Sequence, residues 1–268
     1  MKKKFKLGVI GAGFMSSAIV SGAISKGYLK NSEVIVSDTS EVALKKMSDK
    51  GVFVSANNEE VFKNSEFVLF AVKPQNFVSA VGSVDKHEQY KIISIMAGVK
   101  IEKIKRHFPQ SEIARCMPNT PCSVGYGAVG IDVSGLKNAA DAEFVTGLFS
   151  SFAEVVLTRE ESLNVVTGIS GSAPAYFYLF LKGIIDAGVN RGLSESEAKK
   201  LAVNTMIGSG IMVKENTEKS LEELISAVCS KGGTTIEAVK VFRDKGLSEI
   251  TEEAVSACVR RAEELENL

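Results

Sequence analysis

Short apolar runs alternate with helix-length segments along the first 160 residues of the chain. Most of these runs are rich in Val, Ile and Phe and end in Gly, Pro or small polar residues, as buried parallel strands do. The runs cover residues 7–10, 34–36, 52–54, 67–72, 92–96, 113–117 and 153–157. Because strand and helix signals take turns, we predict an α/β domain with a doubly wound, parallel sheet.

Beyond about Glu161 only helical spacing remains. We therefore predict a boundary near residue 160, with an α/β domain over 1–160 and an all-helical domain over 161–268. The segment from Ala175 to Val189 is apolar nearly all round, and such a helix must be buried. So short a domain offers little interior for it, which predicts an interlocked dimer.

The first apolar run breaks at two glycines whose spacing is typical of dinucleotide binding. Gly11 permits a tight turn, Gly13 lets the backbone approach a pyrophosphate, and the free N–H groups of the following helix bind that anion. Ser16 occupies the place of the third glycine, which weakens the match. The position of the motif after the first strand strengthens it.

The second run ends in Ser37, Asp38, Thr39 and Ser40, where a bound ribose is recognised. An acidic residue there accepts hydrogen bonds from the 2′-hydroxyl of NAD, whereas small hydroxyl residues accommodate the 2′-phosphate of NADP. Asp38 equally fits the N-cap of a helix that starts at Glu41. Both interpretations of Asp38 stay open.

Three later runs end in Gly or Pro turns, at Lys73-Pro74, Ala97-Gly98 and Pro118–Pro121. Parallel strands bring such turns to one edge of the sheet, which is the layout of a ligand crevice. Asn119 lies between two prolines. Its side chain either faces a nicotinamide or caps a rigid turn.

The helical region contains a second stretch of candidate chemistry, Val228–Val239. The apolar residues after its glycines share one helical face: Ile236, Val239 and Phe242. Gly233–Thr235 therefore lie at a helix N-terminus. The amides of Thr234 and Thr235 and the hydroxyl of Ser230 form a cradle suited to a carboxylate. An ordinary capped helix is the alternative.

Charge and composition narrow the class of ligand. Lys plus Arg and Asp plus Glu both total 32, so no net field attracts nucleic acid or an anionic membrane, and a small molecule is the expected partner. No apolar run reaches the roughly 18 residues of a membrane span. The basic start resembles a signal peptide, but the glycine spacing favours a first strand. The cysteines lack metal-site spacing, which predicts no metal and reduced thiols in a cytoplasmic protein.

The inventory of reactive side chains points to hydride transfer. The two histidines, His87 and His107, lie in outer segments of the first domain, and no nucleophile elbow or P-loop pattern occurs. A protonated imine already carries positive charge and accepts hydride directly. Its reduction requires a cofactor, a carboxylate anchor and accurate positioning.

Six stretches in the same order give the whole chain a resemblance to the pyrroline-5-carboxylate reductase family, the last enzyme of proline synthesis. They are Gly11–Gly13, Ala71–Pro74, Ala97–Val99, Met117–Pro121, Ser170–Tyr176 and Cys229–Thr235. The resemblance implies an N-terminal Rossmann domain and a C-terminal dimerisation domain that swaps helices. It implies NADPH as cofactor, with NADH possible, and a homo-oligomer of at least two subunits, with a decamer left open.

The resemblance also assigns roles to individual residues. The substrate-carboxylate loop corresponds to Ser230, Gly233, Thr234 and Thr235. The expected catalytic residues are Thr235, placed near the ring nitrogen, and Glu218, an acidic position that approaches the substrate. The expected cofactor contacts are Gly11, Ala12, Gly13, Phe14, Met15, Ser37, Asp38, Asn58, Ala71, Val72, Lys73, Pro74, Ala97, Gly98 and Asn119.

The second domain departs from the family's pattern in the substrate loop and just before it. Lys231 replaces a usual proline, and Ile225-Ser226 replace a common Lys-Asp pair, which puts the rigidity of the substrate loop in doubt.

Two rival functions are considered. A 3-hydroxyacid dehydrogenase would carry a lysine soon after the glycine-rich start of its second domain. Here the first is Lys182, which we expect to pair with Asp186, either on the same helix or across the dimer interface. A non-catalytic NAD(P) sensor would not need a carboxylate cradle.

Overall fold

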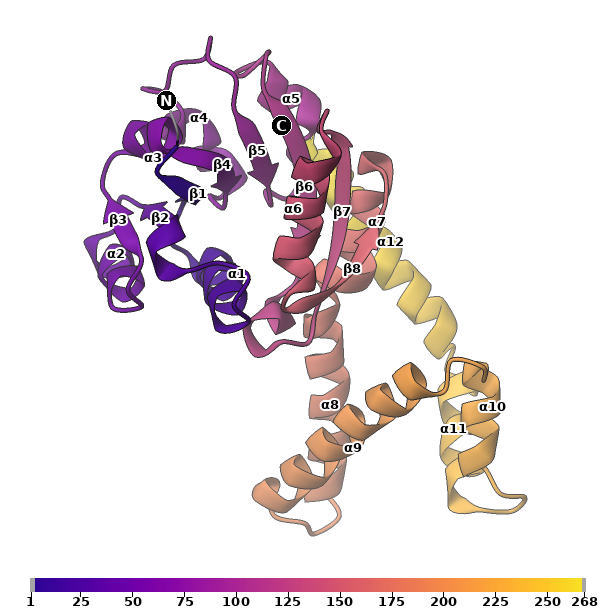
Figure 1. Cartoon of the computed structure of the whole chain (residues 1–268). Coiled ribbons are helices and arrows are strands. Elements are labelled where there is room, and N and C mark those ends of the chain that lie inside the picture. Colours follow the sequence, from indigo (N-terminus) through magenta and orange to yellow (C-terminus); the bar gives the residue numbers. More distant parts are fainter. Residues whose placement is uncertain (1–2, 267–268) are drawn as a thin grey trace. The chain divides into compact units, whose positions relative to one another are not determined.

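The computed structural model describes residues 3–266 (Figure 1). The chain divides into two compact units. The first unit comprises the residues up to Pro174 together with those from Ala257 on, and the second unit is Ala175–Ser256. The predicted boundary near residue 160 follows the last strand and stays a prediction.

The first unit contains an eight-stranded sheet in the order β3-β2-β1-β4-β5-β6-β7-β8. The strands are β1 (Phe5–Ile10), β2 (Val34–Ser37), β3 (Phe53–Ser55), β4 (Ser65–Phe70), β5 (Lys91–Ser94), β6 (Glu112–Pro118), β7 (Gly127–Gly135) and β8 (Ala153–Leu157). Strands β1 to β6 pair in parallel, as predicted. Strand β7 runs antiparallel to β6, and β8 runs parallel to β7.

Strand β7 was not predicted from the sequence. Its three glycines interrupt the apolar pattern that marks the other strands. Close packing explains why glycine occupies two of these positions. A Cβ on Gly130 would lie 2.8 Å from the Val166 side chain, and one on Gly135 would lie 2.2 Å from the carbonyl oxygen of Ile113. The sheet is therefore mixed at this edge, a correction to the all-parallel expectation.

Helices cover both faces of the sheet (Figure 1). Those of the first unit are α1 (Phe14–Ser25), α2 (Glu41–Ser48), α3 (Asn58–Asn64), α4 (Phe77–Ala80), α5 (Ile101–Lys105), α6 (Ala139–Ser150) and α7 (Leu163–Val166). One buried cluster joins α1, α2 and α6 to one face, where Leu7 and Val9 point. The other joins α3, α4 and α5 to the opposite face, where Ile10 and Phe70 point. This two-sided burial explains the nearly continuous apolar runs.

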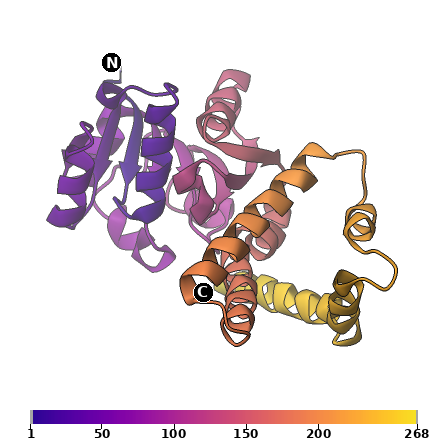
Figure 2. The same ribbon diagram turned by 90° about the horizontal axis from the view of Figure 1, so that it is seen from below.

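The second unit is helical throughout, as the turned view shows (Figure 2). Its helices are α8 (Ala173–Val189), α9 (Glu195–Glu215), α10 (Leu221–Val228), α11 (Thr234–Asp244) and α12 (Leu247–Glu266). Helix α8 begins, and α12 ends, in the first unit. Arg243 of α11 donates to both carboxylate oxygens of Glu222 of α10, at 2.9 and 2.8 Å.

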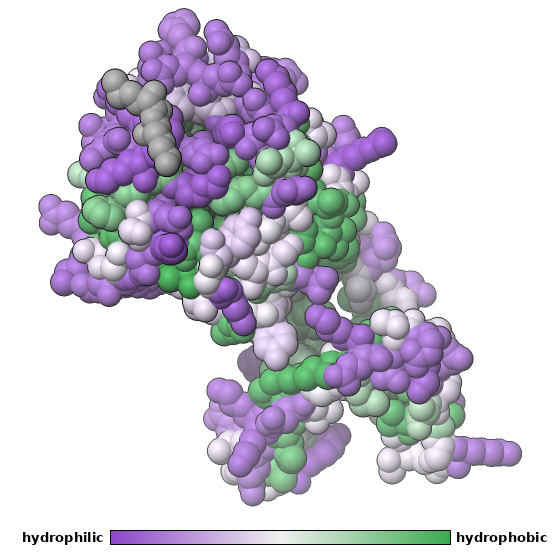
Figure 3. All heavy atoms as spheres, viewed as in Figure 1, coloured by the Kyte–Doolittle hydropathy of each residue, from purple (hydrophilic) through white to green (hydrophobic). Residues whose placement is uncertain are grey.

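The second unit exposes much apolar surface, which Figure 3 shows in green. On α8, Phe177 and Tyr178 are exposed and Leu179 is 74% accessible. The predicted ion pair between Lys182 and Asp186 forms on the same helix, which confirms that expectation. Among residues 3–266, none of the helices has the length and apolar character that crossing a membrane requires.

Candidate active site

The predicted crevice lies where β1, β4 and β5 end side by side. The Ala71 amide donates to the Ile10 carbonyl at 2.9 Å, and the Ile95 amide donates to the Phe70 carbonyl at 3.1 Å. These bonds hold the segments after β4 and β5 beside the glycine-rich turn. The expected meeting of the strand ends at one edge is confirmed.

The two glycines of the first turn play different roles. Gly11 has φ +104°, and a Cβ there would lie 2.8 Å from the carbonyl oxygen of Ala71. Gly13 is the N-cap of α1 and has no side-chain capping bond, and a Cβ there would meet nothing within 4 Å. Open space therefore faces the first amides of α1, and a pyrophosphate group fits that space. Ser16 is buried and donates to the Gly13 carbonyl at 3.0 Å, so it suits the third position of the motif.

A cleft of about 550 Å³ extends from this turn, a volume typical of small-molecule sites. It collects eight of the predicted cofactor contacts: Gly11, Gly13, Ser37, Asp38, Asn58, Ala71, Val72 and Lys73. Ala12 and Phe14 line an adjacent groove between α1 and α2 instead. The remaining five predicted cofactor contacts line neither the cleft nor the groove: Met15, Pro74, Ala97, Gly98 and Asn119.

Sequence reasoning missed polar residues that line the cleft from the segment after β4, namely Asn76 and Ser79. Their position could have indicated a place in the cleft, because both lie in the first turns after Lys73-Pro74, at the same edge of the sheet. Ser37 donates to Asn58 Oδ1 at 2.6 Å, and Asn58 Nδ2 donates to the Ala80 carbonyl at 2.8 Å. This chain of bonds fixes the far wall of the cleft.

Asp38 connects two parts of the cleft. Its Oδ2 accepts from the Ala12 amide at 2.6 Å, and its Oδ1 accepts from the Ser40 amide at 2.8 Å. Helix α2 is capped by Ser40, whose hydroxyl accepts from the Ala43 amide. The interpretation of Asp38 as the cap of this helix is therefore wrong. Its carboxylate ties the glycine-rich turn to the loop after β2.

Asn119 is held by its neighbours. Its Oδ1 accepts from the Ala128 amide at 3.0 Å, its Nδ2 donates to the Ser170 hydroxyl at 3.2 Å, and the residue is 8% exposed. Of its two open interpretations, the geometry favours the rigid turn.

The second candidate site lies in the second unit, at the start of α11. Gly232 has φ +73°, and the Gly233 amide donates to the Ser230 carbonyl at 2.9 Å, which closes a tight turn. Gly233 is the N-cap of α11 without a side-chain capping bond. A Cβ on Gly233 would lie 2.3 Å from Ser230 Oγ, so this hydroxyl stands at the helix opening. Thr234 and Thr235 are the first residues of α11, as predicted.

Other reactive side chains lie outside these two places. Glu218 is exposed in the connection between α9 and α10, and Lys231 is exposed in the loop before α11. His107 packs edge-on against Phe77 with ring centroids 5.2 Å apart, and burial lowers its pKa. Burial also raises the pKa of the Cys116 and Cys122 thiols. No cluster of metal-ligating side chains occurs within residues 3–266.

A doubly wound sheet with an open helix start at its carboxyl edge, followed by a helical unit with a second open helix start, defines a two-domain protein of the dinucleotide-binding class. Comparison with known proteins narrows this class. Residues 160–265 match the family model described as pyrroline-5-carboxylate reductase dimerisation. Residues 6–98 match the model described as NADP oxidoreductase coenzyme F420-dependent.

Relatives extend the match to the whole chain. The pyrroline-5-carboxylate reductase of Synechocystis sp. is 36% identical over 97% of this chain and 98% of its own length. The crystal structure of Plasmodium falciparum pyrroline carboxylate reductase with NADP bound has a TM-score of 0.86 and 28% identity, covering 99% of this chain and 100% of that one. The Coxiella burnetii enzyme gives a TM-score of 0.86 and 30% identity, covering 98% and 99%.

The chain therefore belongs to the pyrroline-5-carboxylate reductase family. This confirms the resemblance, the fold class and the oxidoreductase class inferred from the sequence.

Proposed function

We propose that the protein reduces the C=N bond of 1-pyrroline-5-carboxylate to give L-proline, with NADPH as the preferred hydride donor. A dinucleotide bound in the first unit would supply the hydride that the ring carbon of the protonated imine accepts. The electron pair of the C=N bond then settles on the ring nitrogen, which already holds its proton. The observation that carries this proposal is the open start of α11, with the Ser230 hydroxyl beside it, in a chain of this family.

The residues of the first unit hold the cofactor in this proposal. The amides at the start of α1 bind the pyrophosphate, because Gly13 offers them no side-chain cap and leaves space in front of them. Ser37, Thr39 and Asn58 face the adenosine end from the cleft wall. Asp38 braces the turn, since its two oxygens accept backbone bonds from Ala12 and Ser40.

The residues of the second unit hold the substrate. The amides of Thr234 and Thr235 and the hydroxyl of Ser230 bind the substrate carboxylate, and the positive end of the α11 dipole favours the anion. The Thr235 hydroxyl bonds to the ring nitrogen and orients the imine. Glu218 approaches the same ring as an acidic neighbour. No side chain needs to deliver a proton at the moment of hydride transfer.

We further propose a cytoplasmic homodimer, or a larger assembly up to a decamer. The match to a dimerisation family model and the exposed apolar face of α8 support association.

Steady-state kinetics test the proposed reaction. We expect NADPH oxidation that depends on 1-pyrroline-5-carboxylate, with proline as product and a lower kcat/KM for NADH. Oxidation of a 3-hydroxy acid with NADP would favour the dehydrogenase alternative. NADPH binding without turnover on either substrate would favour a sensor.

A further inference from the structure

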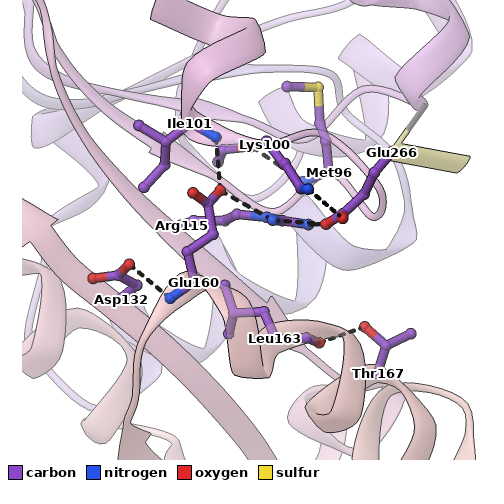
Figure 4. Close-up of polar contacts among 10 residues, drawn as sticks. Met96, Lys100, Ile101, Arg115, Asp132, Glu160, Leu163, Thr167 and Glu266 are labelled. Carbon is purple, nitrogen blue, oxygen red and sulfur yellow. Dashed lines mark hydrogen bonds and ion pairs between the residues drawn. The ribbon is translucent and has the colours of Figure 1, made fainter. Parts of the chain in front are cut away.

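A charged side chain lies fully buried in the sheet of the first unit. Arg115, on β6, is 0% exposed, and a solitary buried charge is costly unless it is paired. Its guanidinium donates to Glu160 Oε1 at 3.0 Å and to Glu266 Oε1 at 3.2 Å (Figure 4). The two carboxylates come from segments far apart in the sequence: Glu160 follows β8, whereas Glu266 lies in the last described turn of α12.

Both carboxylates also bind the segment that joins β5 to α5. Glu160 Oε1 accepts from the Ile101 amide at 2.7 Å, and Glu266 Oε2 pairs with Lys100 Nζ at 3.1 Å. The backbone amide of Glu160 donates in turn to Asp132 Oδ2 at 2.9 Å, which holds this residue in place. Arg115 thus joins β6, α12 and the start of α5 in one network (Figure 4).

The same turn of α12 packs directly on the loop between β5 and α5. Gly98 has φ +69°, and a Cβ there would lie 2.8 Å from the Leu265 Cβ. The backbone of Leu265 and Glu266 also lies within 3.5 Å of that position. The loop is therefore fixed by packing at Gly98 and by charge at Lys100. The Glu266 side chain is only 6% exposed.

We propose that Leu265 and Glu266 are positioning residues for the cofactor, acting through the loop Ala97–Lys100. This inference rests on the proposed function and on the resemblance to the family, which implies that Ala97 and Gly98 contact the dinucleotide. The loop follows β5, which pairs with β4, the strand that leads into the cleft-lining residues Ala71, Val72 and Lys73. Anchoring the loop on α12 holds its backbone in the binding conformation before the cofactor arrives, which reduces the ordering cost of binding.

The test is Glu266→Gln, which keeps the side-chain shape and removes its charge. We expect the Kd of NADPH, measured by calorimetry without substrate, to rise about tenfold. The KM for 1-pyrroline-5-carboxylate should stay within about twofold, and kcat at saturating NADPH should return to the wild-type value. Amide exchange of the peptide covering residues 95–101 should become faster in the variant.

Glu264→Gln is the matched control, because Glu264 lies on the same helix and pairs with Arg261 at the surface. It should leave the Kd of NADPH unchanged. Lys100→Gln is a milder second variant, which keeps the Arg115 pairs and should raise the Kd about threefold. It tests the positioning role by itself if Glu266→Gln does not fold.

The outcomes separate the two proposals. If the wild-type enzyme binds NADPH and reduces the substrate while Glu266→Gln and Lys100→Gln both leave the Kd of NADPH unchanged, the positioning role is overturned and the proposed function stands. A lowered melting temperature in these variants, with the Kd of NADPH unchanged, would overturn the positioning role in the same way. If the wild-type protein does not bind NADPH, both proposals fail.

Discussion

Ser230 and Thr235 stand at the same helix start but offer the substrate different groups. The Ser230 hydroxyl lies over Gly233, outside the helix, whereas Thr235 is the second residue of α11. In the proposed complex the first contacts the carboxylate, which does not change during the reaction, and the second contacts the ring nitrogen, which does. Only an interaction that strengthens in the transition state raises kcat.

We therefore predict different kinetic effects for Ser230→Ala and Thr235→Val. Loss of one hydrogen bond to a charged group should raise the KM of the Ser230 variant for 1-pyrroline-5-carboxylate about tenfold, with little change in kcat. Thr235→Val should lower kcat about a hundredfold. Steady-state assays at saturating NADPH measure both, with Thr251→Val on α12 as a control. Wild-type kinetics in both variants would contradict the cradle.

Asp38 allows a similarly sharp test of cofactor recognition. Asp38→Asn replaces one oxygen by an amide that cannot accept from the Ala12 or Ser40 backbone. Because the change loosens the glycine-rich turn shared by both cofactors, we expect kcat/KM to fall to a similar extent with NADPH and with NADH. A selective loss with NADH would show instead that Asp38 reads the ribose.

The positions of several candidate residues could be predicted from the sequence because they depend on local geometry. Gly11, Gly13 and Thr234 lie where strand and helix periodicity predicts a turn or a helix start. The roles of Asp38 and Asn119 could not be decided in the same way. Some of their hydrogen-bond partners lie on segments distant in the sequence. The alternative interpretations of each residue can be compared only when these hydrogen bonds are known.

At the scale of elements, burial on both sheet faces made six parallel strands predictable, whereas β7 was hidden by its glycines. The Arg115 network was also missed. The sequence does carry a signal for it, since a charged residue within an otherwise apolar central strand must find buried partners. It does not show that one partner is Glu266, 151 positions away.

The contacts of Glu266 at the end of α12 predict how the stability of the fold depends on pH. Burial opposes ionisation of Glu266, but hydrogen bonds from Lys100 and Asn164 and the nearby Arg115 outweigh it and lower its pKa below 4.5. Glu160, also beside Arg115, is the other carboxylate that faces this group. A lowered pKa in the folded state stabilises the fold above the unfolded value, and this stabilisation disappears as pH falls through the folded pKa.

Glu266→Gln should therefore be less stable than the wild-type protein at pH 7, and the difference should shrink as pH falls below about 4.5. Urea unfolding at several pH values and one fixed protein concentration measures this difference. A difference that stays constant down to about pH 3, a value well below the ordinary glutamate range, would contradict the assigned pairing.

At the scale of the whole molecule, a single copy of the chain leaves the apolar side chains of α8 exposed to solvent. The apolar sequence of this helix predicted the need for a partner, and the dimerisation family model covers it. Association explains why a helix with Leu179 74% accessible can be stable in water.

Leu179→Glu should accordingly shift the protein toward monomers, because it places a charge in the centre of that apolar face. Light scattering after gel filtration measures the mass. Val42→Glu, at a comparably exposed apolar position on α2, should leave the mass unchanged. A wild-type protein that is monomeric at all concentrations, or a Leu179→Glu variant with the wild-type mass, would contradict the assignment of this face.

Two open helix starts, one in each unit, are proposed to bind the two anionic groups of the reacting complex, and the proposed function depends on both. A crystal structure with NADPH and a non-reactive cyclic carboxylate such as proline tests this most directly. We predict the pyrophosphate at the first amides of α1 and the carboxylate within hydrogen-bond distance of Ser230 and the amides of Thr234 and Thr235. A carboxylate bound away from residues 230–235 would contradict the proposed function.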